Sequence, residues 1–462
     1  MSEEDFPGPD LVVAGAGGGL IAALRAAQLG LSVLVVETNE HFRRGNNTAM
    51  STAMIPGAGS RWQTEAGVDD SPEAFVADIM AKTKGTADPV LAEALAGVSA
   101  RLVEWMADDL KLPLTLVTDF SYPGHSSYRC HTVPGRIGTA LLDAVWERVA
   151  AEPLIDLYAP ARLVDVTTEA GTVTGVVVTT PDGTEEIPAK AVLLATNGFG
   201  NNRDLVREHL PEIAGAQYYG SEESRGDALR IGTGLGADTA YLDAYQGHAA
   251  LATASASLAG WATVMHGGFL VNREGQRFGN ETVGYSEYAL ESLKHADGQA
   301  WIVLDQRIFD ACESFADFRA TVESGALKWA EDTAGLAAAT GINPAGLERT
   351  LEQTRRIAAG NAPDSFGRTF FEAPLTGRIG AISVQPALFH TQGGLRVDGD
   401  ARVLKIDGAA VPGLYASGGA ANGISGHGAG GYLAGNGLLP ALGLALLAAE
   451  HAAATASAPE SS

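Results

Sequence analysis

The stretch best suited to chemistry lies near the C-terminus, where glycines surround a few polar side chains. It runs from Gly413 to Gly437 and contains Tyr432 and Asn436. The apolar residues at its start, up to Ser417, are typical of a short buried strand. Glycines allow the main chain to approach a flat ligand closely. The stretch therefore predicts a site in which a planar group lies against the backbone.

An apolar run of helical length begins at Leu438, directly after these glycines. The first turn of such a helix has N–H groups without intrahelical acceptors and carries a partial positive charge. A flavin gathers negative charge on its pyrimidine edge when it is reduced, and a helix N-terminus stabilises such charge. We therefore expect this stretch to hold the reactive end of FAD. Pro440 and Gly443 interrupt the run, which favours a buried helix over a membrane span.

A second glycine cluster, near the N-terminus, predicts where the other end of the cofactor binds. Gly15, Gly17, Gly18 and Gly19 follow a short apolar run, and Glu37 closes a second apolar run after an Ala/Leu-rich helix. This is the pattern of a βαβ dinucleotide unit, in which an acid contacts the ribose hydroxyls. The usual G-x-G-x-x-G spacing would put its third glycine at Leu20, whereas here that glycine is Gly19, one residue earlier. The unit nevertheless predicts a site for the adenosine end of FAD.

The next segment, Arg43–Met54, is small and polar. Its side chains suit the diphosphate and the sugar-like chain of a flavin cofactor. It contains no histidine, so the segment offers no residue for a covalent link to the flavin. We therefore expect FAD to be bound non-covalently.

Composition limits the partners. The chain has 462 residues, of which 46% are hydrophobic and 19% charged, with a formal net charge of −24. This balance is typical of a globular protein of more than one domain, and the negative charge disfavours nucleic acid and anionic membranes as partners. Cys130 and Cys312 cannot form a disulfide framework, and the acidic N-terminus has no signal-peptide core. We expect a cytoplasmic protein that binds neither nucleic acid nor membrane.

The remaining segments predict the elements that position these motifs. Residues 163–168, 173–180 and 185–187 alternate in polarity between turn residues, which predicts a β-meander. The apolar run 189–195 predicts another buried strand. Ser71 begins a stretch of helical spacing that extends to about Leu110.

The middle of the chain has a different character, which begins at His248. Residues 267–281 predict a hairpin, 301–305 a strand, and 306–360 a mostly helical region. The fold class we predict is α/β: a Rossmann-like FAD-binding domain, with a parallel sheet plus β-meander, and an inserted α+β capping domain. The predicted boundaries are 1–247 for the first part of the FAD-binding domain, 248–389 for the substrate capping domain, and 390–462 for the second part, which holds the flavin end.

In this order the motifs resemble a flavoprotein family that includes soluble fumarate reductases, flavin-dependent ketosteroid dehydrogenases and related desaturases. The resemblance covers nearly the whole chain. Besides the two glycine clusters it rests on Gly45–Thr48, residues 195–200, the segment 271–281 and the His-Thr-Gln-Gly-Gly sequence that begins at His390. It implies FAD bound across two discontinuous segments, a domain that closes over the substrate, and hydride transfer between a substrate carbon and flavin N5.

The resemblance also implies which residues hold the cofactor, position by position. The expected FAD contacts are Gly15, Gly17, Gly18, Gly19, Glu37, Thr38, Gly45, Asn46, Asn47, Thr48, Ser51, Thr52, the backbone of Arg162, Asp227, Gly419, Asn436, Gly437 and Leu438.

Two arginines that fumarate reductases use are absent. Tyr285 stands where one of them would follow the Asn280–Glu281 pair, and Gly431, beside Tyr432, stands where the other would be. Without these arginines a dicarboxylate would lack its bidentate clamps and its proton donor. The two tyrosines instead resemble those that ketosteroid dehydrogenases use as a base and as a ligand of the ketone, although the residues directly after Tyr432 depart from that family.

Two histidines of the fumarate reductases, which help to hold a substrate carboxylate, are retained as His248 and His390. Each lies where the chain crosses between the predicted domains, so both are expected to face an interdomain cleft. Either histidine could instead be satisfied within a packed hinge, and either tyrosine could be an ordinary packing residue.

The resemblance thus implies α,β-desaturation of a ketone. Tyr432 would polarise the carbonyl, Tyr285 would take the α proton, and a β hydride would pass to the flavin. A tyrosine base needs a lowered pKa, which His248 or His390 could provide. The expected substrate is a small, cyclic ketone or keto acid, such as 4-oxocyclohexanecarboxylate or a 3-ketosteroid-like ketone.

Two alternatives remain at the level of sequence. The chain could be an enoate reductase of the fumarate-reductase type, or a flavoprotein subunit that passes electrons to a partner. No cysteine motif for haem or an iron–sulfur cluster is present, so a partner would supply such centres. The sequence leaves the electron acceptor unknown.

Overall fold

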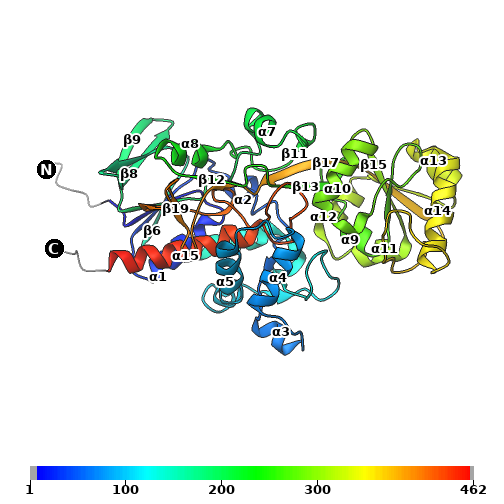
Figure 1. Cartoon of the computed structure of the whole chain (residues 1–462), viewed down its shortest axis with the longest axis horizontal. Coiled ribbons are helices and arrows are strands. Elements are labelled where there is room, and N and C mark those ends of the chain that lie inside the picture. The colour runs from blue at the N-terminus through cyan, green and yellow to red at the C-terminus, as the bar shows by residue number, and fades with distance from the viewer. Residues whose placement is uncertain (1–7, 458–462) are drawn as a thin grey trace. The chain divides into compact units, whose positions relative to one another are not determined.

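The structure is a computed structural model that describes residues 8–457, and its internal contacts divide the chain into two units. The first contains the described residues up to Leu210, then Gly220–Tyr245 and the residues from His390 onward, and the second contains Pro211–Tyr219 and Gln246–Phe389. Two of the crossings between them fall within strands, β13 (Tyr245–Ala252) and β17 (Ile379–Thr391) (Figure 1).

A six-stranded sheet forms the centre of the first unit, in the order β19-β20-β10-β1-β2-β6. Five neighbouring strands run parallel, and β19 pairs antiparallel with β20 at one edge. The inner strands are continuous apolar runs because both faces of a parallel sheet are covered. The strands are β1 (Leu11–Ala14), β2 (Val33–Val36), β6 (Ile155–Tyr158), β10 (Ala191–Leu194), β19 (Arg402–Leu404) and β20 (Ala410–Ala416).

The long C-terminal helix α15 (Leu438–Ala456) is the core helix of this unit. It packs against α1 (Gly19–Gln28) and α5 (Pro89–Asp108), and Figure 1 shows it in red beside the blue α1. By length and hydropathy alone α15 could cross a membrane, but 67% of its most apolar window is buried inside the protein. Its apolar surface is therefore used in the core, as the interrupted run predicts.

Three smaller sheets complete the strands of the first unit. The predicted β-meander is confirmed as the antiparallel sheet β7-β8-β9. The other two sheets are β3-β5-β4 and β12-β18. The strands of all three sheets are β7 (Arg162–Glu169), β8 (Thr172–Thr180), β9 (Gly183–Pro188), β3 (Ile55–Pro56), β4 (Thr115–Leu116), β5 (Cys130–Thr132), β12 (Thr239–Ala240) and β18 (Gly394–Leu395). The other helices are α2 (Phe42–Gly45), α3 (Arg61–Glu65), α4 (Pro72–Lys82), α6 (Gly138–Val149), α7 (Arg203–His209), α8 (Asp227–Gly234), η1 (Pro134–Arg136) and η3 (Gly418–Ala420).

The single helical stretch predicted after Ser71 is two helices, α4 and α5. Ser71 caps α4 as expected, because its side chain accepts a hydrogen bond from Ala74 N–H. The chain then turns at Gly85, whose φ of 76° a glycine adopts without strain. Asp88 caps α5 by accepting from the N–H groups of Val90 and Leu91.

The second unit is built on a sheet in the order β11-β17-β15-β14, with β13 and β16 also paired to β17. Its strands besides β13 and β17 are β11 (Gln217–Tyr218), β14 (Phe269–Val271), β15 (Ala300–Asp305) and β16 (Leu327–Ala330). Its helices are α9 (Ala262–Met265), η2 (Glu281–Val283), α10 (Tyr285–His295), α11 (Gln306–Cys312), α12 (Ala316–Glu323), α13 (Thr333–Thr340) and α14 (Pro344–Ala358). The two units together confirm the predicted α/β fold class.

The predicted hairpin at 267–281 is wrong. Its first arm is β14, which pairs with β15 and not with the residues that follow the turn. The turn itself exists, because Asn272 and Gln276 are joined by a backbone hydrogen bond of 3.0 Å. The second arm is not a strand, because Arg277 is held by ion pairs to Glu281 and Asp364.

Candidate active site

The turn after β1 has the close packing that a dinucleotide site requires. Gly15 has a φ of 116°, and a Cβ at this position would lie 2.3 Å from Ala195 O. A Cβ on Gly19 would lie 2.6 Å from Cγ1 of Val13, within the strand that precedes the turn. The third glycine therefore lets α1 approach β1, which is one of the roles of glycine in this motif.

Glu37, the acid at the end of β2, is held beside this turn. Its carboxylate accepts hydrogen bonds from Ala16 N–H at 2.7 Å and from Asn39 N–H at 2.8 Å. Burial raises the pKa of Glu37. The carboxylate lies at the carboxyl end of a parallel strand, where open α/β sheets bind their ligands.

The polar loop after α2 lies against the glycine turn. Asn46 donates from Nδ2 to Ala16 O at 3.3 Å, and a Cβ on Gly17 would lie 3.2 Å from Oγ1 of Thr48. Ser51 donates from Oγ to Thr48 O at 2.7 Å. The loop and the turn thus form one wall, although they are far apart in sequence.

Other predicted cofactor residues of the first unit are engaged with the protein itself. Asn47 Oδ1 accepts from Ser221 N–H at 2.6 Å, and Thr52 O accepts from Thr132 Oγ1 at 3.3 Å. Thr38 follows Glu37 and is half-buried.

The two predicted residues Arg162 and Asp227 form an ion pair. Arg162 donates from Nη2 to the two carboxylate oxygens of Asp227 at 3.0 and 2.8 Å. Glu223 lies 3.4 Å from Nη1 of the same guanidinium. Asp227 is the first residue of α8, so the pair fixes the start of that helix against β7.

Several buried polar atoms of the first unit have no hydrogen-bond partner among residues 8–457, and they include Thr196 Oγ1, Ser417 Oγ and Asn436 Oδ1. Thr196 and Ser417 follow the carboxyl ends of β10 and β20, and Asn436 precedes α15. A buried polar atom without a hydrogen bond is costly. These atoms would suit a polar cofactor, such as FAD, bound along the carboxyl edge of the sheet.

The glycines near the flavin end also fit this cofactor. A Cβ on Gly419 would lie 2.6 Å from Asn197 Oδ1. A Cβ on Gly437 would lie 2.8 Å from Nε2 of His390 and 3.6 Å from Oη of Tyr432. The backbone of Gly437, directly before the first residue of α15, can therefore be approached only because this residue has no side chain.

His390 and Tyr432 form the first half-site, by which we mean this pair in the first unit. Their ring centroids are 5.9 Å apart and their ring planes are inclined at 71°. Burial lowers the pKa of His390 to about 4. Its imidazole is therefore neutral near pH 7 and can serve as a hydrogen-bond donor and acceptor, as a tyrosine hydroxyl can.

Two buried side chains, His125 and Arg129, support the backbone beside Tyr432. His125 Nε2 lies 3.0 Å from Ala434 O, and its Nδ1 lies 3.0 Å from Arg129. Arg129 has no exposed side-chain surface and pairs with Asp70 and Asp78. His125 and Arg129 are therefore buried structural residues, whereas Ser126 and Tyr128 of the same loop are exposed.

His248 and Tyr285 form the second half-site, which lies in the second unit. The two rings stack with centroids 4.7 Å apart and planes at 22°. Phe389 stacks on the other side of His248 at 5.0 Å and 19°, and Tyr219 packs on Phe389 at 5.2 Å. Trp261 meets both His248 and Tyr285 edge-on.

His248 is neutral and its tautomer is fixed. Burial lowers its pKa to about 3. Nδ1 accepts a hydrogen bond from Ala250 N–H at 3.1 Å, so the ring proton is on Nε2. Because His248 and His390 are both neutral near pH 7, neither supplies a positive charge that would lower the pKa of a tyrosine base. They supply N–H dipoles instead.

Tyr285 is the first residue of α10, where the helix dipole favours negative charge. Gly284 before it has a φ of 123°, a conformation that a residue with a side chain rarely adopts. Ser286 accepts a hydrogen bond at Oγ from Gly247 N–H at 3.0 Å. This bond sets the first turn of α10 against the residue that precedes His248.

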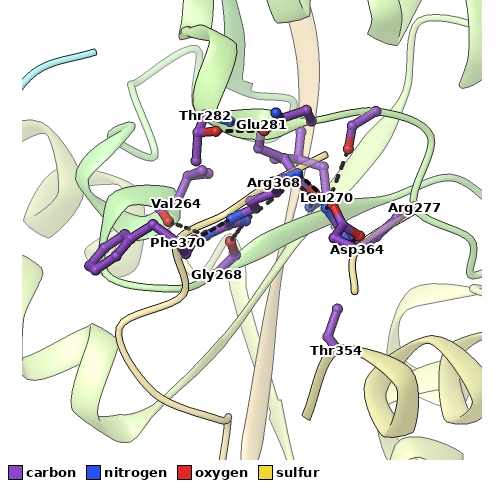
Figure 2. Close-up of polar contacts among 12 residues, drawn as sticks. Val264, Gly268, Leu270, Arg277, Glu281, Thr282, Thr354, Asp364, Arg368 and Phe370 are labelled. Atoms are coloured by element: carbon purple, nitrogen blue, oxygen red, sulfur yellow. Dashed lines mark hydrogen bonds and ion pairs between the residues drawn. The ribbon is translucent and has the colours of Figure 1, made fainter. Parts of the chain in front are cut away.

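A buried ion-pair network holds the turn that leads to Tyr285. Glu281 is fully buried and accepts from Arg277 at 2.7 Å and from Arg368 at 3.2 Å. Asp364 pairs with Arg277 at 2.7 Å. Figure 2 shows Arg368 directed toward Glu281 and toward the carbonyl groups of Gly268 and Val264. Two cations and two anions balance, which a buried network requires.

Trp261 is a candidate that the sequence reasoning missed. Only 5% of its surface is exposed, yet within the part of the chain that the structure describes its Nε1–H has no hydrogen-bond partner. It contacts the rings of both residues of the second half-site. The only signal in the sequence was the change in character after His248.

A glycine turn with an acid on the next strand, buried orphan atoms along the carboxyl edge and a glycine-lined helix N-terminus define an FAD-dependent oxidoreductase. The FAD binding domain family matches residues 10–438. The chain belongs to this family.

Individual relatives agree with this assignment. A fumarate reductase (cytochrome) of Shewanella frigidimarina is 28% identical over 96% of this chain and 77% of its own length. A fumarate reductase of Schizosaccharomyces pombe is 27% identical over 96% of this chain and 89% of its own length. A urocanate reductase of Eggerthella lenta is 26% identical over 88% of this chain and 69% of its own length.

Solved structures show the same fold. An open conformation of a flavocytochrome c3 fumarate reductase superimposes with a TM-score of 0.82, at 26% identity over 97% of this chain and 79% of that chain. A 3-ketosteroid delta1-dehydrogenase from Sterolibacterium denitrificans superimposes with a TM-score of 0.77, at 21% identity over 97% of this chain and 99% of that chain. The second likeness concerns the fold alone.

Proposed function

We propose that this flavoprotein is a dehydrogenase that introduces a double bond α,β to the ketone of a small cyclic substrate. Residues 248–389 act as its substrate cap, and the substrate is a ketone or keto acid of the 4-oxocyclohexanecarboxylate or 3-ketosteroid type. The observation that carries the proposal is that each half-site pairs a tyrosine with a neutral histidine.

The second half-site favours an apolar ring over a dicarboxylate. Its surface consists of the rings of Tyr285, His248, Phe389 and Trp261. None of these rings is cationic near pH 7, because burial lowers the pKa of His248 to about 3. A second carboxylate placed here would lose hydration without gaining a charged partner. A cyclic hydrocarbon skeleton would instead gain contact with aromatic faces.

The first half-site supplies two hydrogen-bond donors for a carbonyl oxygen. Tyr432 Oη and His390 Nε2 both lie near the Cα of Gly437, just before the first turn of α15. Negative charge grows on a carbonyl oxygen when its α proton is removed. Donors fixed in advance stabilise that charge at no cost of reorganisation.

Tyr285 is the proposed general base. Its place at the start of α10 favours the negative charge of a phenolate, and its stacking on His248 fixes the ring. It would take the α proton at Oη, and the rings packed around it would keep water away from that step. FAD, when bound, supplies the two-electron acceptor for the hydride that leaves the β carbon.

The direction of the reaction gives the test. Oxidised enzyme is mixed anaerobically with 4-oxocyclohexanecarboxylate, and the loss of the visible absorption of oxidised flavin is followed. We expect the ketone to bleach the flavin and to give the unsaturated ketone. A flavin that stays oxidised with every cyclic ketone tried would overturn the proposal.

A second candidate is an enoate reductase, which saturates a double bond. It is supported by the names of the relatives, which include fumarate reductases and a urocanate reductase. In that case photoreduced enzyme would be reoxidised by fumarate or urocanate and not by unsaturated cyclic ketones. The two half-reactions therefore separate the candidates on one preparation. An electron-transfer subunit would show neither half-reaction at a useful rate.

A further inference from the structure

A chain of side-chain hydrogen bonds runs through the first unit to His390. Asn436 Nδ2 donates to Ser425 Oγ at 3.0 Å, and Ser425 Oγ donates to Gln392 Oε1 at 2.8 Å. Gln392 Nε2 lies 2.9 Å from His390 Nδ1. We call Asn436, Ser425 and Gln392 the relay. All three are buried, with exposed fractions of 0%, 1% and 5%.

The hydroxyl group of Ser425 gives the relay its direction, because it has a single proton to donate. Ser425 has one hydroxyl proton, which it gives to Gln392 Oε1 while its oxygen accepts from Asn436. The amide N–H of Gln392 therefore faces His390 Nδ1. Nδ1 also lies 3.3 Å from Thr391 O, which can only accept, but the Gln392 contact is shorter at 2.9 Å. Because two donors cannot face each other, the shorter contact makes Nδ1 an acceptor and puts the ring proton on Nε2.

The direction of the relay matters at both of its ends. At one end Nε2–H of His390 lies 2.8 Å from the point that a Cβ on Gly437 would occupy, beside Tyr432. At the other end Asn436 presents Oδ1, a buried acceptor without a hydrogen-bond partner in the part of the chain that the structure describes. In the only other self-consistent arrangement every donor and acceptor is exchanged. Asn436 would then present its N–H at the cofactor, and His390 would carry its proton on Nδ1.

We infer that Gln392 is a positioning residue that holds His390 in the Nε2–H tautomer, and that the relay couples this tautomer to the hydrogen-bond acceptor that Asn436 presents at the cofactor site. His390 is thereby a donor, which a carbonyl or carboxylate oxygen accepts, and it cannot remove a proton at Nε2. The tautomer stands on the contacts of the first unit alone. Its effect on turnover rests on the proposed function.

The tautomer of His390 is measurable without substrate or turnover. The full chain is labelled with isotopic nitrogen in histidine, and two-bond nitrogen–proton correlation spectra are recorded at pH 7 with and without FAD. His390→Gln identifies the signal by its disappearance. We expect the Nε2–H pattern in the wild-type protein. An Nδ1–H pattern would overturn the inference, even if the ketone reaction were confirmed.

Two substitutions at position 392 test the role of the amide. Gln392→Glu places a carboxylate, which only accepts, against Nδ1, so we expect the ring proton to move to Nδ1. Gln392→Met removes both hydrogen bonds at similar length, so we expect a mixture of tautomers. Gln385→Met, which removes an exposed amide from the second unit, should leave the His390 signal unchanged.

Kinetics then separate positioning from folding. With a ketone substrate we expect Gln392→Glu to lower kcat/KM about tenfold, the size of one lost hydrogen bond of about 1.4 kcal/mol, with FAD content and Tm close to wild type. Ser425→Ala, which breaks the relay at its middle, should give a mixed tautomer like that of Gln392→Met. A wild-type tautomer in both Gln392→Glu and Ser425→Ala would show that the relay does not position His390.

Discussion

Each unit of the molecule contains one histidine–tyrosine pair, and the two pairs are held in different ways. His248 and Tyr285 are stacked face to face, with ring planes at 22°. His390 and Tyr432 meet edge-on, with ring planes at 71°. The first geometry covers apolar ring surface, whereas the second leaves the polar atoms of both rings beside the Cα of Gly437.

The forces behind the two pairs differ accordingly. Phe389 and Trp261 hold His248 through ring contacts, and a single backbone N–H fixes its tautomer. His390 is held by the buried side-chain relay that ends at Gln392. The same residue types can thus form an apolar wall in one place and a set of aimed donors in another. The environment, and not the residue type, decides which role each histidine has.

Among the substitutions that test the two pairs, Tyr285→Phe is expected to have the largest effect on turnover. The change keeps the ring that stacks on His248 and removes the oxygen that takes the proton. We expect kcat to fall by roughly two or more orders of magnitude with FAD still bound, the usual size of a general-base effect. Tyr288→Phe, one turn along α10, is the control, because the buried Tyr288 hydroxyl has no hydrogen-bond partner among the described residues. If Tyr285→Phe turned over within a few-fold of wild type, Tyr285 would not be the base.

Tyr432→Phe is expected to have a smaller effect, because a second donor remains beside it. Removal of one donor to a developing oxyanion costs about a hundredfold or more where no other donor replaces it. With His390 Nε2–H still in place we expect kcat/KM to fall by roughly tenfold to a hundredfold. Steady-state kinetics with the ketone measure this. The double variant with His390→Gln should lose more than either single variant, and equal losses would contradict shared donation.

Trp261→Phe tests whether the second half-site contains a donor besides its apolar rings. The change keeps an aromatic ring and removes a buried N–H that has no hydrogen-bond partner within residues 8–457. If the substrate accepts from this N–H, KM should rise by about threefold to tenfold, the size of one neutral hydrogen bond, with kcat nearly unchanged. Trp329→Phe is the control, since that ring packs on Arg378 elsewhere in the unit. An unchanged KM would mean that the substrate accepts no hydrogen bond from Trp261 and that the second half-site offers it only apolar ring surface.

The smallest expected effect is that of pH on substrate binding. Burial lowers the pKa of His248 to about 3 and that of His390 to about 4, so the neutral form of both persists on acidification. We expect KM for a ketone to stay constant from about pH 5.5 to 8, across the ordinary histidine pKa. An inflection of KM near pH 6.5 that disappeared in a His248→Gln or His390→Gln variant would show a charged histidine in the site.

The same shifts affect stability. In the unfolded chain these histidines titrate at about pH 6.5, so between that pH and their lowered pKa values the unfolded state binds more protons. The contribution of these neutral histidines to the free energy of unfolding is therefore fully present above about pH 6.5 and is lost as the pH falls toward their lowered pKa values. Thermal unfolding followed at several pH values measures this slope, which His248→Gln should reduce.

Local patterns in the sequence sufficed for elements that depend on neighbouring residues. The glycine turn at Gly15, the meander β7-β8-β9 and the helix α15 were predicted because turn residues, alternation and apolar length act within one segment. The boundary between α4 and α5 was missed because the Gly85 turn and the Asp88 cap interrupt a spacing that otherwise continues.

Long-range partners explain what the sequence could not supply. The second arm of the predicted hairpin fails because Arg277 pairs with Asp364, far along the chain. The relay joins three segments of the sequence at Gln392, Ser425 and Asn436, and no spacing rule connects them. The neutrality of His248 depends on the rings packed around it. The sequence therefore predicted the histidine and the tyrosine of each half-site, but the aromatic surroundings of one pair and the polar surroundings of the other are seen only in the folded chain.

The central claim is that both tyrosines act on one ketone. A crystal structure with FAD and 4-oxocyclohexanecarboxylate, or its unsaturated product, tests it most directly. We predict Tyr432 Oη at about 3 Å from the ketone oxygen and Tyr285 Oη at about 3 to 3.5 Å from the α carbon. A ligand whose carbonyl contacts neither phenol, or whose α carbon lies beyond about 5 Å from Tyr285 Oη, would contradict the account.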